Sequence, residues 1–282
     1  MSKYKFDATR VFMTVAAEEQ GLLGARHWAT QAREKKLNIA GMFTNDIIGS
    51  SRADNGKVDN KQVRLFAQSI PATKEMSDAI RTLVQTGGEN DSISRQLARH
   101  TKEQGERYQK DFKVSVIQRH DRYLRGGDHM PFLEQGYAAL RFTEPAEDFA
   151  HQHQDLRTEN GKVYGDLIEF NDYDYIAKVT RVNAAALASL ALAPSAPQAV
   201  KLRTDKLTND STLVWQANPE PDLAGYRVVW RETTAANWQG SKWVGNVNEA
   251  TIDLSKDNVF FGVQAVDKDG NVSPATYPMP QR

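Results

Sequence analysis

The sequence predicts an α/β domain followed by a small all-β sandwich. In the first part of the chain, short apolar runs alternate with segments of helical period, the pattern of a mainly parallel sheet with helices on both faces. After residue 193 the helical period stops, and short alternating strands with turn residues follow, as in a β-sandwich. The segment PSAPQ has the composition of a linker. We therefore expect one domain over residues 1–193 and a second over residues 194–282.

Five strands and four long helices are expected in the first domain. Continuous or alternating apolar runs predict the strands, at residues 11–17, 37–43, 62–69, 112–117 and 137–142. Apolar residues at helical spacing predict the helices, at residues 22–35, 73–85, 92–109 and 172–192. A further helical turn or two is expected at residues 129–135.

The second domain is expected to consist of six short strands. They are predicted at residues 199–203, 211–215, 225–230, 243–247, 250–254 and 259–266. The segment DKDGN that follows predicts a tight turn. We expect the rings of Trp215 and Tyr226 to be core aromatics of the two sheets.

Composition excludes several classes of protein. Lysine plus arginine and aspartate plus glutamate each number 36, so no net charge attracts nucleic acid or an anionic membrane. No apolar run approaches the ~20 residues of a membrane span. The absence of cysteine excludes disulfides and thiolate metal sites, so a metal ion would need His, Asp and Glu ligands. Residues 1–10 contain no apolar segment of a signal peptide.

Acidic side chains follow two of the predicted strands. The apolar run 11–17 ends in Glu18 and Glu19 just before a helix, and Asp46 follows the next strand. The ends of strands just before helices are where open α/β folds place their chemistry. Each acid alone is also compatible with a solvated turn or a loop cap. The histidines at positions 120, 129, 151 and 153 are likewise compatible with places on the surface or in an ion-paired loop.

Taken together, these residues satisfy the requirements of a site for two divalent cations. Such a site needs carboxylates and imidazoles from several strand ends, converging on one rim. It also needs a carboxylate that is not a ligand, to take a proton from the water that the metal activates. Adjacent glutamates at a strand-to-helix turn point in different directions, so one can bind metal while the other faces the water.

Four blocks of the chain resemble the co-catalytic zinc aminopeptidases, the family that also contains glutamate carboxypeptidase and secreted bacterial leucyl aminopeptidases. The blocks are AAEEQGLLGARHWA, TNDIIG, RHDRYLRGGDHMPFLEQGYAALRFTE and HQHQD, in the family's order over roughly residues 10–155. The end of the chain resembles a fibronectin type III module, in LVWQANPEPDLAGYRVVWRE and VFFGVQAVDKDGNVSP. The resemblance implies a secreted or periplasmic zinc exopeptidase with two zinc ions in the complete site and a peptide substrate.

The resemblance also implies a role for individual residues. Glu18 matches the general base, Glu19 a ligand of one zinc, and Asp46 a ligand of the other. His151, four residues before an aspartate, matches the remaining ligand, whereas His153 has no matching role. The segment that shapes the wall and specificity pocket in the family is matched here by Arg119, Asp121, Arg125, Asp128 and His129. These residues are equally compatible with a structural, ion-paired loop.

One part of the family's pattern is missing. The family has a histidine and, two residues later, a bridging aspartate well before the Glu-Glu block. Only ten residues precede the strand at 11–17 here, and none is histidine. We therefore expect the C-terminal part of a longer secreted peptidase, which lacks the first strands of its sheet and has three of five ligands. Such a chain should bind metal weakly and have weak or no activity alone.

The leading functional hypothesis is a zinc-dependent aminopeptidase in which a metal-bound hydroxide attacks the peptide and Glu18 is the general base. One alternative is a non-catalytic remnant that acts as a binding module, through the β-sandwich or another surface. Another is an acyltransferase similar to glutaminyl cyclase, against which the intact Glu-Glu pair argues mildly.

Overall fold

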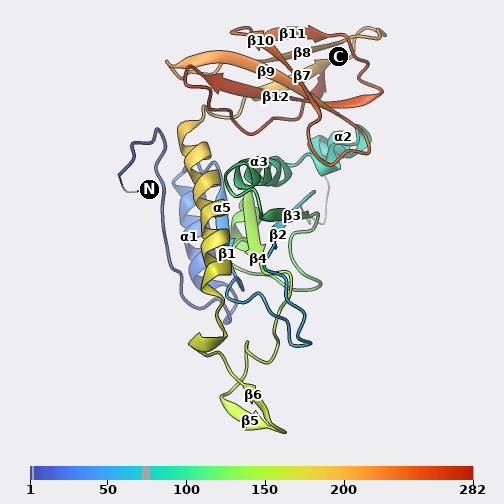
Figure 1. Cartoon of the computed structure of the whole chain (residues 1–282). Coiled ribbons are helices and arrows are strands. Elements are labelled where there is room, and N and C mark those ends of the chain that lie inside the picture. The colour runs from blue at the N-terminus through green and yellow to red at the C-terminus, as the bar shows by residue number, and fades with distance from the viewer. Residues whose placement is uncertain (2, 72–76, 282) are drawn as a thin grey trace. The chain divides into compact units, whose positions relative to one another are not determined.

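The computed structural model describes residues 1, 3–71 and 77–281 and contains two compact units (Figure 1). The sheet unit consists of Thr14–Gln68 and Thr101–Ala186. The sandwich unit consists of Met1–Met13, Ser69–His100 and Leu187–Arg282. Residues 69–100 therefore belong with the C-terminal sandwich, although they are distant from it in the sequence.

A four-stranded mixed sheet forms the core of the sheet unit. Its order is β1-β4-β2-β3, with β1 at Met42–Asn45, β4 at Ala139–Thr143, β2 at Gln62–Ala67 and β3 at Lys113–Ile117. The β1–β4 and β2–β3 pairs are parallel, whereas β2 and β4 are antiparallel. The α/β class is thus confirmed, and β4 and β2 are the inner strands of the sheet.

The two inner strands, β4 and β2, are mostly apolar and mostly buried. Every residue of β4 is buried, and so are four of the six residues of β2. A strand covered on both faces carries a continuous rather than an alternating apolar run. Arg141 is the exception in β4, because its side chain is charged and yet fully buried.

The expected helices are present, with shifted ends. They are α1 at Leu23–Glu34, α2 at Asp78–Gln85, α3 at Ile93–Tyr108, α4 at Met130–Glu134 and α5 at Tyr173–Leu192. The first residues predicted for α2 lie outside the described residues. Helix α5 buries Tyr175, Val179, Val182 and Ala186 at helical spacing. Helix α1 buries the small residues Ala25 and Ala29, which pack with Phe132 of α4.

The predicted strand at residues 11–17 is wrong. This segment forms no strand, and Val11 and Phe12 are 62% and 74% exposed. An apolar run forms a strand only where a neighbouring strand accepts its backbone hydrogen bonds. Within the described part of the chain, no strand pairs with residues 11–17.

The sandwich unit contains two sheets that face each other (Figure 1). One has the order β10-β9-β12, and the other β11-β8-β7-β13. The strands lie at Gln198–Arg203 (β7), Ser211–Gln216 (β8), Leu223–Glu232 (β9), Gly240–Gly245 (β10), Glu249–Ile252 (β11), Val259–Asp267 (β12) and Met279–Gln281 (β13). Trp215 and Tyr226 are buried with their ring centroids 5.2 Å apart, which confirms their prediction as core aromatics.

The hydroxyl of Tyr226 gives a test of the sandwich core. Its oxygen accepts a hydrogen bond of 2.7 Å from the backbone N–H of Asn218, and the ring is fully buried. Tyr226→Phe leaves this donor without its partner, so we expect a loss of about 1 kcal/mol in the free energy of unfolding. Urea denaturation measures the change. Tyr108→Phe, at a tyrosine that is 68% exposed, is the control and should have no effect.

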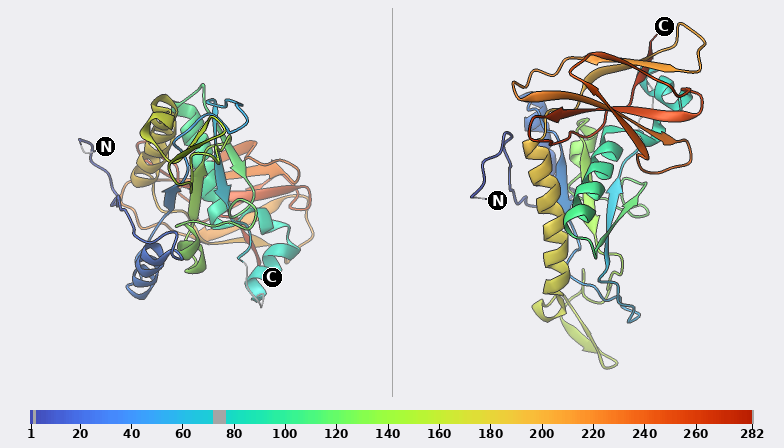
Figure 2. Two further views of the ribbon diagram at one scale, coloured as in Figure 1. Left: turned by 90° about the horizontal axis from the view of Figure 1, so that it is seen from below. Right: turned by 45° about the horizontal axis from the view of Figure 1, so that its top comes forward.

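Smaller elements complete the chain. Two short 3₁₀ helices, η1 and η2, lie at Gly88–Asn90 and Ile168–Phe170. Strands β5 (Arg157–Glu159) and β6 (Lys162–Tyr164) form a mostly exposed hairpin that projects from the sheet unit in Figure 1 and in the right view of Figure 2. Among the helices of the described residues, none has the length and apolar character needed to cross a bilayer.

Candidate functional site

Glu18 and Glu19 lie on a tight turn that leads into α1. Ala17, Gly21 and Leu22 all have positive φ angles, so the chain reverses sharply around the two glutamates. The backbone oxygen of Glu18 accepts hydrogen bonds from the N–H groups of Gly21 and Leu22, at 3.1 and 2.8 Å. The turn therefore holds the backbone of Glu18 through hydrogen bonds from the residues just before the helix.

Glycine is required where this turn meets the helix. The backbone N–H of Gly24 donates to the oxygen of Ala16 at 3.0 Å. A Cβ atom at Gly24 would lie only 2.6 Å from that same oxygen. The Gly-Leu-Leu-Gly sequence that follows the glutamates thus has a local structural reason in this turn.

Glu18, Glu19 and Asp46 line one pocket of about 350 Å³, together with Arg125 and His153. Asp46 enters the pocket because it directly follows β1, where its N–H donates to the oxygen of Phe142 in β4 at 3.1 Å. The sheet and the turn before α1 thus bring together three of the acids that were predicted to share a site.

Three carboxyl groups in and around this pocket have raised pKa values. Burial raises the pKa of Glu18, and the nearby carboxylates of Asp46, Glu19 and Asp128 raise it further. Burial also raises the pKa of Asp46, although the guanidinium of Arg141 opposes that effect. The pKa of Asp128 is raised by burial and by Asp46. The crowded negative charge is unfavourable by itself and would be relieved by a cation.

The predicted wall residues lie at different depths. Arg125 lines the pocket, whereas Arg119 is exposed and donates to the hydroxyl of Tyr123 at 3.1 Å. Asp121 and His129 are buried. Burial lowers the pKa of His129 to about 4, so its ring is neutral at pH 7.

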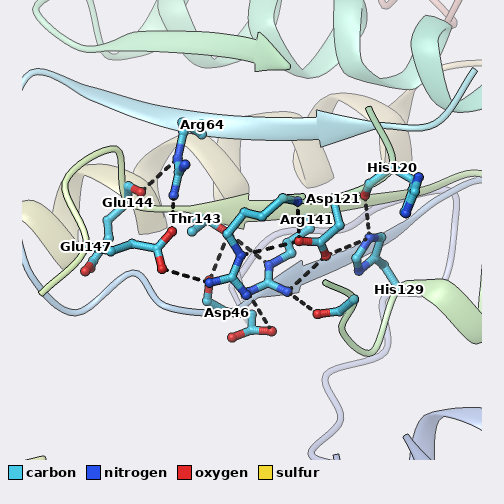
Figure 3. Close-up of polar contacts among 11 residues, drawn as sticks. Asp46, Arg64, His120, Asp121, His129, Arg141, Thr143, Glu144 and Glu147 are labelled. Carbon is cyan, nitrogen blue, oxygen red and sulfur yellow. Dashed lines mark hydrogen bonds and ion pairs between the residues drawn. The ribbon is translucent and has the colours of Figure 1, made fainter. Parts of the chain in front are cut away.

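Buried polar contacts fix the position of His129 (Figure 3). Its Nε2 lies 2.7 Å from the backbone oxygen of His120 and 3.5 Å from Oδ2 of Asp121. Asp121 also contacts Arg122 and Arg141. Asp121 is thus ion-paired inside this loop, as a structural role predicts, and Arg125 is the predicted wall residue that lines the pocket.

His151 and His153 are placed differently from each other. His151 lines a neighbouring pocket of about 1000 Å³, where its Nδ1 lies 2.7 Å from Oδ2 of Asp148. Its ring stacks on Phe170 with the centroids 3.5 Å apart. His153, in contrast, places Nδ1 3.4 Å from Oε1 of Glu19 and has a positive φ of 54°. The structure therefore brings the unassigned histidine, not His151, to the Glu-Glu pocket.

The donors in this pocket fit part of a zinc site. Carboxylate oxygen and imidazole nitrogen are ligands that zinc accepts, and both types are present. Among residues 1, 3–71 and 77–281, however, no three His, Asp or Glu side chains are grouped closely enough to hold a metal ion. The donor types in this pocket nevertheless agree with zinc chemistry.

Two residues of the site have no role in the sequence-based prediction. Arg141 reaches Asp46 from inside β4, and His153 reaches Glu19. Arg141 carried a signal in the sequence, because it is the one charged residue in the apolar strand 137–142. Such a residue needs a buried partner of opposite charge. The spacing of the HQHQ segment carried no comparable signal for choosing between its two histidines.

Glu144 gives a pH-dependent test of the neighbouring pocket. It is 2% exposed, and its Oε2 accepts a 2.7 Å hydrogen bond from the N–H of Ser50. Burial raises its pKa to about 8. Above about pH 4.3 the unfolded state releases the proton of Glu144, whereas the folded state keeps it up to about pH 8. The free energy of unfolding therefore falls as pH rises through this range, by up to about 1.4 kcal/mol per pH unit.

Glu144→Gln should remove this part of the pH dependence and make the protein more stable at pH 8. Urea unfolding at several pH values measures the slope. Glu159→Gln, at a side chain that is 58% exposed, is the matched control. An unchanged slope in Glu144→Gln would contradict the assigned cause.

The chain matches the model of one protein family and is similar to several relatives. The model of peptidase family M28 matches residues 2–163. A Leptosphaeria maculans protein named a probable zinc metalloprotease is 48% identical over 280 residues, which are 99% of this chain and 65% of that protein. A Pyricularia oryzae protein of the same description is 48% identical over 278 residues, 97% of this chain and 55% of that protein.

Two solved structures are also similar over part of the chain. The aminopeptidase from Aneurinibacillus sp. strain AM-1 has a TM-score of 0.39 and 17% identity, over 64% of this chain and 32% of that chain. An Fn3-like protein from Clostridium thermocellum has a TM-score of 0.26 and 19% identity, over 32% of this chain and 93% of that chain.

The family match covers more than half of the chain and contains Glu18, Glu19, Asp46 and both histidines of the HQHQ segment. The sequence relatives extend over nearly the whole chain, whereas the chain spans 65% and 55% of their own lengths. On this evidence the chain belongs to peptidase family M28.

Proposed function

We propose that this chain carries the general base and part of the metal site of a zinc-dependent exopeptidase, with an aminopeptidase favoured. The observation that carries the proposal is the pocket at the end of β1, where Glu18 lies with Glu19 and Asp46. Burial and the neighbouring carboxylates raise the pKa of Glu18, the direction that favours a general base. Membership of family M28 supports peptide-bond hydrolysis as the reaction.

The residues of this chain have separate tasks in the proposed reaction. Glu18 accepts a proton on a carboxylate oxygen from the attacking water and returns it to the leaving amine. Glu19, Asp46 and His151 would hold zinc, which supplies Lewis acidity and a lowered pKa of water when bound. His151 lines the neighbouring pocket, where Asp148 contacts its Nδ1 and leaves Nε2 as the ring nitrogen for a metal. Arg125 faces the same pocket and is available to contact a peptide.

The complete activity is proposed for a longer protein. The chain spans 65% of the Leptosphaeria maculans relative and 55% of the Pyricularia oryzae relative. An incomplete ligand set binds metal weakly. We therefore expect the isolated chain to bind little zinc and to hydrolyse peptides slowly or not at all. A secreted or periplasmic location is proposed on the same family resemblance.

A second candidate is a non-catalytic module that acts by binding. The observation that favours it is the absence, within the described residues, of a group of side chains able to hold a metal. In this case a longer protein that contains the chain would also lack zinc. Zinc content therefore separates the two candidates.

Peptide cleavage tests the proposed reaction in a chimera in which this chain replaces the matched 65% of the Leptosphaeria maculans relative. The chimera is incubated with zinc and a set of peptides, and the products are identified by mass spectrometry. We expect single residues to be released from free amino termini, and acetylation of the amino terminus to stop the reaction. Release from the carboxyl terminus, cyclisation of N-terminal glutamine or no turnover would contradict the proposal.

A further inference from the structure

Arg141 is a buried arginine in the middle of β4, and its guanidinium contacts four groups (Figure 3). Nε donates to Oγ1 of Thr143 at 2.9 Å, and Nη1 donates to Oδ2 of Asp121 at 3.0 Å. Nη1 also donates to the backbone oxygen of Gly126. Nη2 forms an ion pair with Oδ2 of Asp46 at 3.1 Å, without the geometry of a hydrogen bond. One side chain thus joins the end of β1 to the loop before α4.

Charge balance alone does not require the contact with Asp46. A buried guanidinium needs a carboxylate partner, and Asp121, whose side chain is fully buried, supplies one. The side chain of Asp46 is 29% exposed and could otherwise turn toward solvent. Its contact with Arg141 therefore restricts the direction in which this carboxylate points into the pocket.

Two further contacts strengthen this restriction. Thr143, which accepts from Arg141, donates through Oγ1 to the backbone oxygen of Asp46 at 3.0 Å. Gly127 packs directly over the ion pair. A Cβ atom there would lie 2.8 Å from Nη1 of Arg141 and 2.9 Å from Oδ2 of Asp46. Both the backbone and the carboxylate of Asp46 are thus held by groups connected to Arg141.

We propose that Arg141 is a positioning residue that orients the carboxylate of Asp46 for metal binding. The inference deepens the proposed function and depends on it, because it assigns Asp46 to the metal. Groups that orient a metal ligand commonly change metal affinity by about 10–100-fold when they are removed. The alternative is that Arg141 only neutralises Asp121 and stabilises the fold.

The test uses the chimera described above and measures zinc affinity by competition with a chelator. Arg141→Met should lower the affinity by about 10–100-fold, and Arg141→Lys, which retains one charged donor, should lower it less. The visible absorption of the Co²⁺-substituted protein reports ligand geometry and should change in Arg141→Met. Arg64→Met is the matched control, because Arg64 lies in the adjacent strand β2 and pairs with Glu147 instead.

A double variant separates positioning from folding. Arg141→Met alone leaves the buried carboxylate of Asp121 with Arg122 as its remaining arginine partner and can unfold the protein. Arg141→Met with Asp121→Asn removes both charges, while Asp121→Asn alone keeps the contact between Arg141 and Asp46. We expect the double variant to lose zinc affinity and the Asp121→Asn single variant to retain it.

The outcomes distinguish the two levels of the proposal. A folded double variant with unchanged zinc affinity and an unchanged Co²⁺ spectrum would overturn the role of Arg141 and leave the proposed function intact. An unsubstituted chimera that binds no zinc would overturn the proposed function, and the inference with it. If Arg141→Met does not fold, the double and Arg141→Lys variants decide the question.

Discussion

Glu18→Gln is expected to lower the turnover of the chimera by about 10²–10⁴-fold, the usual contribution of a general base. Glutamine has the shape of glutamate but cannot accept a proton from the attacking water. The substitution also removes a negative charge from a pocket in which Asp46 and Glu19 already raise the pKa of Glu18. Zinc content should therefore be retained while catalysis is lost. Hydrolysis of an aminoacyl chromogenic amide, together with metal analysis, measures both.

Two controls make this expectation specific. Glu34→Gln, at an exposed glutamate that ends α1, should leave turnover unchanged. The pH dependence gives a second readout, because a raised pKa of Glu18 places the acid limb of the rate profile above that of an ordinary glutamate. A Glu18→Gln variant that is folded, loaded with zinc and still fully active would show that another group is the base.

Arg231→Met is expected to destabilise the sandwich unit by about 3–5 kcal/mol, the cost of breaking a buried ion pair. Asp91 accepts from Arg231 through Oδ2 and from Arg99 through Oδ1, at 2.5 and 3.0 Å. The exposed fraction of the side chain is 0% for Asp91, 1% for Arg231 and 8% for Arg99. Removal of Arg231 leaves the carboxylate of Asp91 buried with less compensation. Urea denaturation of the 282-residue chain measures the loss.

An exposed pair in the same unit is the matched control. Arg203 pairs with Glu249, and their side chains are 48% and 51% exposed. Arg203→Met makes the same chemical change and should alter stability by no more than about 1 kcal/mol. A double variant, Arg231→Met with Asp91→Asn, removes the uncompensated charge and should recover part of the loss. Equal effects of Arg231→Met and Arg203→Met would contradict the importance of the buried pair.

Local patterns in the sequence predicted the helices and most strands, and long-range pairing explains what they missed. Helices α1 and α5 were predicted within one residue of each end, because an amphipathic period is a property of the segment itself. Residues 11–17 were wrongly predicted as a strand, because an apolar run forms a strand only where another strand pairs with it, and none does here among the described residues. Strand β13 was missed, because it is three residues long and contains Pro280.

The candidate site could be predicted only in part, for a similar reason. Acids at the ends of predicted strands identified Glu18, Glu19 and Asp46, and the structure places all three around one pocket, although the strand predicted before the two glutamates is absent. The loop that holds Asp121 and His129 could not be recognised as buried, because its partner Arg141 lies in a distant strand. The sequence also did not show that His153, which has a positive φ, contacts Glu19 whereas His151 does not line that pocket.

Zinc content is the most direct test of the central claim, that Glu18 acts beside a metal held in part by Glu19 and Asp46. The unsubstituted chimera, Glu18→Gln, Glu19→Gln and Asp46→Asn are dialysed against zinc and analysed by atomic emission. We predict two zinc ions per molecule in the first two proteins, and a loss of zinc in Glu19→Gln and in Asp46→Asn. Full zinc content in all four proteins, or none in the unsubstituted chimera, would contradict the claim.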